Sequence, residues 1–267
     1  MMKKRLLALA LAALMVLPLA ACSEDKGPDT DLAYIQDKGT LVVGITDFAP
    51  MDYQDEEGQW IGFDADMARA FADHLGVEVR FEVVDWPSKH LNLQDKKIDL
   101  VWNGMTLTDE IRLQMDVSVP YCKNAQVVVL PANRVANYPT EDSLKGLVIT
   151  AEDNSAGADA LAHAGLTCFA SDTQMDAIAQ VASGGADACV IDQFMAATLT
   201  APDAQYPDLA MGVELGDQAE SIVVGFRKGS DLTGIFNQFW RDACTDGTVD
   251  DIAQRYNMSS FVLKTTP

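Results

Sequence analysis

Apolar residues recur along this chain with two alternating periods. Short runs rich in β-branched residues predict strands, and apolar residues three or four positions apart predict amphipathic helices. In the first half, the predicted elements are helix 32–38, strand 39–46, helix 64–75, strand 77–84, helix 89–94 and strand 98–102. This β-α-β-α-β order predicts a parallel sheet with helices on both faces.

A second series of alternating strands and helices follows. Its predicted elements are strand 126–130, strand 147–151, helix 156–164, strand 166–170, helix 172–184, strand 188–191, a helix opening at 192, strand 222–226, a helix from 232 and helix 248–256. Asp64, Asp172, Asp192 and Thr248 are predicted to cap helices. Two such series, with a crossing near 127–131, predict two α/β lobes. The last strand and helices are expected to return to the first lobe, and a ligand is expected between the lobes.

The turn after strand 98–102 has the features of a binding edge. It is polar from Asn103 to Thr108, and Thr108 is placed to cap a helix with Asp109 and Glu110 in its first turn. A strand end that opens onto a helix N-terminus presents unpaired N–H groups, and ligands bind there in open α/β sheets. An ordinary βα turn has the same pattern, so this stretch alone leaves both interpretations open.

Residues 1–21 are predicted to be an export signal. Lys3, Lys4 and Arg5 precede an apolar run that is too short to span a bilayer comfortably. The run ends in Leu-Ala-Ala-Cys22, which resembles a bacterial lipobox, in which Cys22 is lipidated and becomes the mature N-terminus. A plain secretory signal with a coincidental cysteine is the alternative. Residues 22–31 are polar and predict a flexible tether, so the protein is expected outside the cytoplasm, lipid-anchored to the outer face of the cell membrane.

Charge and motifs exclude several classes of function. Loss of the signal reduces the 19 basic residues to 16 against 40 acidic ones, a net charge of about −24, which should repel nucleic acid and anionic lipid. No GxSxG, HExxH or P-loop motif occurs, and no Cys/His cluster suggests a metal, so no cofactor is expected. Cys122, Cys168, Cys189 and Cys244 fit buried thiols about as well as disulfides, and four cysteines allow three pairings.

Five motifs occur in a fixed order between residues 39 and 256. They are Gly39-Thr-Leu-Val-Val-Gly44, Gly62-Phe-Asp-Ala-Asp66, Gly104-Met-Thr-Leu-Thr-Asp-Glu110, Ser118-Val-Pro-Tyr121 and Asp246-Gly-Thr248. With them the chain resembles the extracytoplasmic solute-binding proteins of the polar amino acid type, bacterial family 3, which deliver ligands to ABC importers. The resemblance implies an α/β, two-lobe periplasmic-binding-protein-like fold (type II), with two doubly wound sheets joined by a two-strand hinge. Lobe 1 is expected from 32–127, lobe 2 from 128–221, and the return to lobe 1 from 222–267.

The resemblance also implies which residues contact the solute. An aromatic residue of the first loop packs on the ligand, the turn after strand 98–102 offers backbone and hydroxyl groups, a helix N-terminus in lobe 2 binds a carboxylate, and Asp192 accepts an ammonium. Trp102 fits the cleft or the core about equally well. The expected ligand-binding residues are Phe48, Trp102, Asn103, Gly104, Thr106, Thr108, Arg112, Asn154, Ser155, Ala156 and Asp192.

One position departs from the family pattern. The family usually has an arginine directly after Thr-Asp-Glu to grip the α-carboxylate, but Ile111 occupies that slot and Arg112 follows it. One residue is a rotation of about 100° on a helix, so Arg112 should point elsewhere unless the turn is irregular. Loss of one member of a buried charge pair typically costs about 2–5 kcal/mol. Either the carboxylate is held otherwise, or the ligand lacks one in that place.

The predicted function is that of a monomeric substrate-binding lipoprotein that delivers a small polar solute to the permease of an ABC importer. Two alternatives stay open. A cyclohexadienyl dehydratase-like enzyme on the same scaffold could use Glu152 or Asp153 as an acid, although no nucleophile–base pair supports catalysis. A partner-dependent ligand sensor would also use lobe closure.

Overall fold

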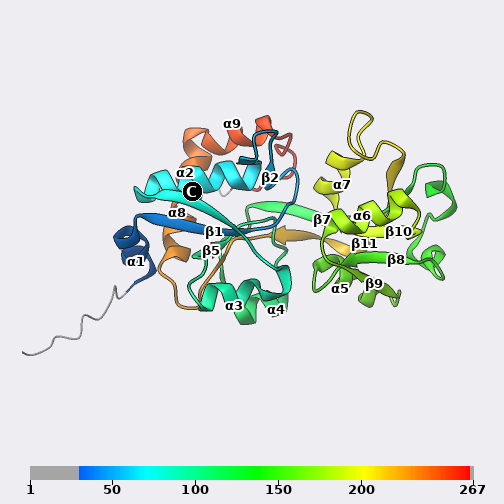
Figure 1. Ribbon diagram of the computed structural model, residues 1–267, viewed down its shortest axis with the longest axis horizontal. Helices are drawn as coiled ribbons and strands as arrows, with labels where there is room; N and C mark the ends of the chain where they lie inside the picture. The colour runs from blue at the N-terminus through cyan, green and yellow to red at the C-terminus, as the bar shows by residue number, and fades with distance from the viewer. Residues whose placement is uncertain (1–29, 265–267) are drawn as a thin grey trace, which may run out of the picture.

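The computed structural model describes residues 30–264 and shows two α/β lobes side by side, connected by long strands (Figure 1). The sheet of lobe 1 has the strand order β4-β1-β5-β12-β6, and that of lobe 2 has the order β11-β7-β10-β8-β9. The predicted signal, Cys22 and residues 23–29 of the predicted tether lie outside the described residues. Thr30 caps the first helix, so the described fold begins before the predicted boundary at residue 32.

Lobe 1 takes elements from both ends of the chain. Its elements are α1 Asp31–Lys38, β1 Thr40–Ile45, β2 Tyr53–Gln54, β3 Trp60–Ile61, α2 Phe63–Leu75, β4 Glu78–Val83, η1 Trp86–Ser88, α3 Lys89–Gln94, β5 Leu100–Val101, α4 Asp109–Gln114, β6 Asp116–Val117, β12 Gly225–Phe226, α8 Leu232–Asp246 and α9 Thr248–Arg255. β4, β1 and β5 are parallel, and β12 is antiparallel to both β5 and β6.

The alternation of side chains along β1 separates two hydrophobic layers. Leu41, Val43 and Ile45 pack with residues of α2, α8 and α9. Val42 faces the other layer, which contains residues of α3 and α4. Figure 1 shows these two groups of helices on opposite faces of the sheet.

Lobe 2 is built from the middle of the chain. Its elements are β7 Cys122–Pro131, η2 Val135–Asn137, η3 Glu141–Leu144, β8 Ile149–Glu152, α5 Ala156–His163, β9 Cys168–Ser171, α6 Gln174–Ser183, β10 Ala188–Asp192, α7 Gln193–Leu199 and β11 Leu209–Ile222. β9, β8 and β10 are parallel, whereas β7 is antiparallel to both β10 and β11.

Strands β7 and β11 connect the two lobes. They pair from Leu209 opposite Pro131 at one end to Ile222 opposite Cys122 at the other, where Ile222 also forms a bridge with Thr106 of lobe 1. Strand β11 was not predicted from the sequence, and Ile222 was assigned to the same predicted strand as the residues of β12. The alternation of Leu209, Met211, Val213 and Leu215 is a period-2 signal that could have revealed it.

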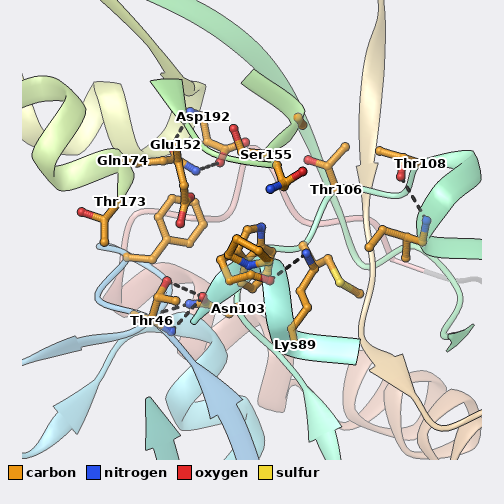
Figure 2. A pocket seen from close by; sticks show the side chains of 18 of the residues that line it. Thr46, Lys89, Asn103, Thr106, Thr108, Glu152, Ser155, Thr173, Gln174 and Asp192 are labelled. Carbon is orange, nitrogen blue, oxygen red and sulfur yellow. Dashed lines mark hydrogen bonds between the residues drawn. The ribbon is translucent and has the colours of Figure 1, made fainter. Parts of the chain in front are cut away.

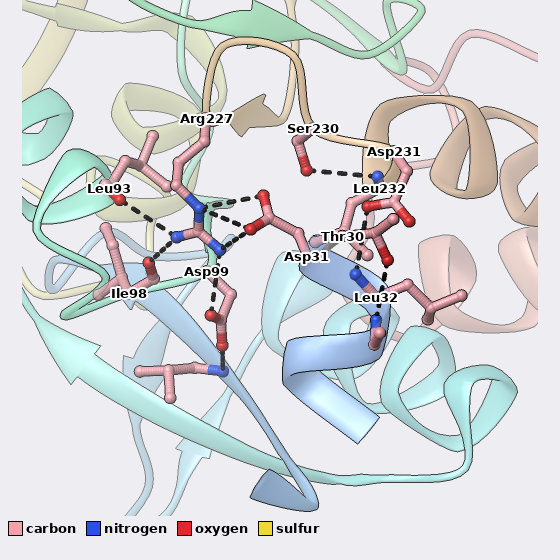
Figure 3. Close-up of polar contacts among 12 residues, drawn as sticks. Thr30, Asp31, Leu32, Leu93, Ile98, Asp99, Arg227, Ser230, Asp231 and Leu232 are labelled. Carbon is pink, nitrogen blue, oxygen red and sulfur yellow. Dashed lines mark hydrogen bonds and ion pairs between the residues drawn. The ribbon is translucent and has the colours of Figure 1, made fainter. Parts of the chain in front are cut away.

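Arg227 ties the returning segment to the start of lobe 1 (Figure 3). Its Nε donates to both oxygens of Asp31 at 3.0 Å, and an Nη donates to the Ile98 carbonyl at 2.7 Å. Its guanidinium also pairs with the fully buried Asp99 at 3.4 Å. Asp99 in turn accepts from the Val42 N–H at 2.7 Å. A guanidinium shared between two carboxylates and backbone carbonyls satisfies these buried groups together, and so it fixes α1 against β1 and β5.

Several predicted helix caps are shifted. Thr108 accepts from the Ile111 N–H at 3.2 Å, as predicted. However, Gly62, Thr173 and Gly247 hold the N-cap positions expected for Asp64, Asp172 and Thr248. Asp64 is instead buried in the first turn of α2, and its carboxylate accepts from Gly104 and Tyr121 rather than from the helix N-terminus. Asp192 stands at the start of α7, but its side chain makes no capping bond.

The structure bears on two expectations from the sequence, the membrane-spanning segments and the state of the cysteines. Between residues 30 and 264, no helix is long and apolar enough to cross a membrane. Cys122, Cys168 and Cys189 are free cysteines, and Cys122 and Cys189 are buried. Burial raises the pKa of both buried thiols, which makes them unreactive.

Candidate functional site

A cavity of about 160 Å³ lies where the two lobes face each other (Figure 2). Both lobes line it, and it is roomy enough for a small solute rather than a single water molecule. Of the residues expected from the sequence, the structure brings together Phe48, Asn103, Gly104, Thr106, Thr108, Asn154, Ser155, Ala156 and Asp192 around this pocket.

Two expected residues lie elsewhere, and their assignment is corrected. Trp102 is fully buried in the core of lobe 1, where its ring packs edge-on against Phe236 at 4.9 Å between centroids. Arg112 is exposed and does not line the pocket, whereas its neighbour Ile111 is buried and does. The helical rotation between adjacent residues explains why only one of the two faces the pocket.

The turn after β5 is held by side chains beneath the pocket. The Asn103 amide oxygen accepts from the N–H and hydroxyl of Thr46 at 2.9 and 2.6 Å, and its nitrogen donates to Asp52 at 2.8 Å. The Gly104 N–H donates to Asp64 at 2.7 Å. Gly104 has a φ of +56°, and a Cβ there would approach Phe48 Cε1 to 2.3 Å. The turn and the ring of Phe48 are therefore packed directly against each other.

Asp52 and Asp64 form a fully buried acidic pair that supports this turn without lining the pocket. Besides Gly104, Asp64 accepts from the Tyr121 hydroxyl at 2.6 Å. Burial raises the pKa of Asp64 to about 7. Burial, and then repulsion from Asp64, raises the pKa of Asp52 well above its usual range.

On lobe 2, Asp192 ends β10 with its carboxylate held by neutral amides. Gln126 Nε2 donates to it at 2.8 Å, Gln174 Nε2 donates at 2.6 Å, and Asn124 donates as well. Asp192 is 4% exposed, and burial, followed by repulsion from Glu220, raises its pKa to about 7. None of these three amides is a cation, so a bound cation would be the natural counter-ion of Asp192.

The hinge strands β7 and β11 are part of the same hydrogen-bond network. Glu220 on β11 accepts from Asn124 at 3.0 Å and from Gln126 at 2.8 Å, both on β7. It also accepts from the Thr106 hydroxyl at 3.2 Å, across to lobe 1. A single side chain thus connects the two hinge strands to the turn that lines the pocket.

Helix α5 begins at the pocket. Ser155 is buried and caps it by accepting from the Ala158 N–H at 3.2 Å. Asn154 precedes it with a φ of +53°. Because a helix N-terminus carries unpaired N–H groups and the positive end of the helix dipole, this end of α5 suits a carboxylate.

Two buried ionisable residues on the pocket wall, Lys89 and Glu152, were not predicted from the sequence as ligand-binding residues. Lys89 is 5% exposed, its Nζ donates to the Trp86 carbonyl at 3.1 Å, and it lies 4.3 Å from the centre of the Trp86 ring. Burial lowers the pKa of Lys89 to about 8, against the opposing effect of Glu152. Glu152 is 6% exposed, and burial, followed by repulsion from Asp192, raises its pKa to about 8.

Local sequence carries no signal for these two roles. Lys89 stands at the start of a helix, where a lysine is ordinarily solvated, and Glu152 had been considered only as an acid of the alternative enzyme. As for metals, residues 30–264 contain no group of three or more His, Cys, Asp or Glu side chains that could hold an ion.

Comparisons with known proteins agree with this architecture. The L-cystine-binding protein TcyJ of Escherichia coli is 32% identical over a stretch that covers 42% of this chain and 42% of that protein, less than half of either. Cyclohexadienyl dehydratase of Pseudomonas aeruginosa is 29% identical over 54% of each chain. The arginine-binding extracellular protein ArtP of Bacillus subtilis is 27% identical and matches 96% of this chain and 98% of its own length.

The similarity extends to solved structures and to a family model. A variant of ArgBP from T. maritima matches with a TM-score of 0.79 and 28% identity, over 85% of this chain and 99% of that chain. This likeness confirms the predicted two-lobe, type II fold. The model for bacterial extracellular solute-binding proteins, family 3, matches residues 41–259. This chain therefore belongs to the bacterial extracellular solute-binding proteins of family 3.

Proposed function

We propose that this protein is the solute-binding lipoprotein of an ABC importer and that it captures an amino acid between its lobes. The observation that carries the proposal is a pair of complementary subsites on lobe 2. The buried carboxylate of Asp192 suits an ammonium, and the N-terminus of α5 suits a carboxylate. Both interactions are strong in a cleft from which water is excluded.

Capture proceeds by closure about β7 and β11. A solute that touches both lobes stabilises the closed arrangement over the open one, and it shifts the equilibrium by its difference in affinity for the two. The closed form then presents a surface complementary to a membrane permease. Export and a lipid anchor at Cys22 keep the protein, as a monomer, at the outer face of the membrane.

The pocket favours a solute with more than one cationic group. Asp47, Glu110 and Asp159 line it in addition to Glu152 and Asp192. The relatives named for arginine and for cystine support an amino acid as the solute. Among these, a basic amino acid fits the acidic lining better.

A thermal-shift screen tests this proposal. The purified protein is heated with each standard amino acid, ornithine, cystine and polyamines. A ligand that binds only the folded state raises the melting temperature, and the rise should be largest for a basic amino acid and lost in Asp192→Ala. If no amino acid shifts the melting temperature at millimolar concentration, the proposal is wrong.

One observation favours a second candidate function, an enzyme similar to cyclohexadienyl dehydratase. Glu152 is a buried pocket carboxyl with a pKa of about 8, so it would hold a proton at neutral pH and could act as a general acid. Incubation with a cyclohexadienyl substrate tests this candidate. Formation of product by the wild type but not by Glu152→Gln would establish it.

A further inference from the structure

Lys89 is a buried cation whose hydrogen-bonding capacity is mostly unused. An ammonium has three N–H donors, and the Lys89 amine donates one hydrogen bond, to the Trp86 carbonyl at 3.1 Å. Within residues 30–264, no carboxylate lies within 4.0 Å of this amine. A buried charge without a close counter-ion is costly, so an anionic group of a ligand would be stabilised beside Lys89.

The position of Lys89 directs its charge at the pocket. It begins α3, directly after the 3₁₀ turn Trp86–Ser88, and the ring and carbonyl of Trp86 hold its amine at the pocket wall. Among the described residues that line the pocket, it is the only lysine or arginine. Figure 2 shows the amine pointing toward the wall that carries Ser155 of lobe 2.

We propose that Lys89 binds the carboxylate of the captured solute, in place of the arginine whose usual slot is occupied by Ile111. This inference rests on the proposed function, because it assigns the contact that lobe 1 makes with an amino acid. The carboxylate is held between the Lys89 amine of lobe 1 and the N-terminus of α5 of lobe 2.

This arrangement explains three features of the pocket together. It gives Lys89 the counter-ion that it lacks, and it gives the first turn of α5 an anion. It also places the carboxylate between the two lobes, so that binding itself favours closure. The ammonium then goes to Asp192, and Glu152 is left to accept a cationic side chain.

The inference predicts discrimination between an amino acid and the amine formed by its decarboxylation. Calorimetric titration compares arginine with agmatine, histidine with histamine, and cystine with cystamine. The wild type should bind the acid of the best pair at least about 30-fold more tightly than the amine, the equivalent of one buried charge contact. Lys89→Met should bring the two affinities to within about threefold of each other, mainly by weakening the acid.

Matched variants keep the test specific. Arg112→Met removes an exposed cation of the same lobe that lies outside the pocket, and it should keep the full preference for the acid. Lys89→Arg retains the positive charge and should keep most of the preference for the acid. If Lys89→Met does not fold, Lys89→Gln, which keeps the length of the side chain and a donor without the charge, carries the same comparison.

The outcomes separate this inference from the proposed function. Amino acid binding by the wild type with an unchanged acid preference in Lys89→Met would overturn the role of Lys89 and leave the receptor function standing. An equal loss of affinity for the acid and for the amine in Lys89→Met would also overturn the role of Lys89, because Lys89 would then act as an interlobe partner of Glu152. If the wild type binds no amino acid, the proposed function fails and this inference fails with it.

Discussion

Both lobes bury carboxyl groups near the pocket, but they use them differently. In lobe 1, Asp52 and Asp64 lie beneath the binding turn and hold Asn103 and Gly104 in place. In lobe 2, Asp192 and Glu152 line the pocket themselves. Burial is the largest cause of the raised pKa in all four carboxyl groups. A raised pKa therefore identifies a buried acid, and only the geometry shows whether that acid supports the site or contacts the solute.

The donors around each acid explain the difference. Asp64 accepts from the Gly104 N–H and the Tyr121 hydroxyl, both of which belong to the frame of lobe 1. Asp192 accepts from side-chain amides on β7 and α6, and part of its carboxylate remains at the pocket wall. Asp64, which we call the support acid, should therefore control stability. Asp192, which we call the contact acid, should control affinity.

Replacement of the contact acid is expected to have the largest effect. Asp192→Asn keeps the shape but removes the charge that meets the ammonium, so affinity should fall by about 2–5 kcal/mol. The free energy of unfolding of the empty protein should change by at most about 1–3 kcal/mol, because loss of the buried charge offsets the amide donor that is left without an acceptor. Calorimetric titration and urea unfolding measure the two quantities, with the exposed Asp203→Asn of the same lobe as control. A large loss of stability with unchanged affinity would reverse the assignment.

Replacement of the support acid should produce the opposite pattern. Asp64→Ala leaves the buried N–H of Gly104 and the hydroxyl of Tyr121 without an acceptor, at about 1–3 kcal/mol for each group. Because the variant also relieves the repulsion between Asp64 and the buried Asp52, urea unfolding should show a total loss of about 2–4 kcal/mol. The exposed Asp73→Ala on the same helix should change little. A variant as stable as the wild type would contradict the support role.

A smaller effect is expected where the two roles meet, at Gly104. Gly104→Ala places a Cβ 2.3 Å from the ring of Phe48 at a φ of +56°, so the ring must move and the backbone is strained. Stability should fall by about 1–3 kcal/mol, and affinity should fall with it because Phe48 lines the pocket. Gly58 has a φ of +76°, but no atom lies within 4 Å of a Cβ placed there. Gly58→Ala therefore measures the cost of backbone strain alone. Equal losses in the two variants would show that the contact with Phe48 is unimportant.

The same division explains what the sequence could predict. Periodicity located most helices and strands, and caps such as Thr108 and Ser155 are local features that local sequence can identify. The family motifs located most of the pocket. Asp64 was taken for a helix cap, because its acceptor role depends on Gly104 and Tyr121, 40 and 57 residues away. Lys89 was missed for the same reason, since its burial depends on the fold as a whole.

The last predicted effect is a pH dependence that separates the lobes. Asp192 and Asp64 each have a folded pKa of about 7 against an ordinary value of 3.8. Between those two values the folded protein holds protons that the unfolded chain has released, so the stability of the empty protein should fall as pH rises from about 4 to 7.

Of these two acids, only Asp192 should affect affinity. An ammonium favours the charged carboxylate, so binding below pH 7 should release a proton and affinity should rise with pH, by at most about 1.4 kcal/mol per unit. Titrations in two buffers of different ionisation enthalpy count the protons released. Asp192→Asn should flatten the affinity profile below pH 7, whereas Asp64→Asn should flatten only the stability profile. If Asp64→Asn also flattened the affinity profile, the support acid would be coupled to the solute, and the distinction between the lobes would be one of degree.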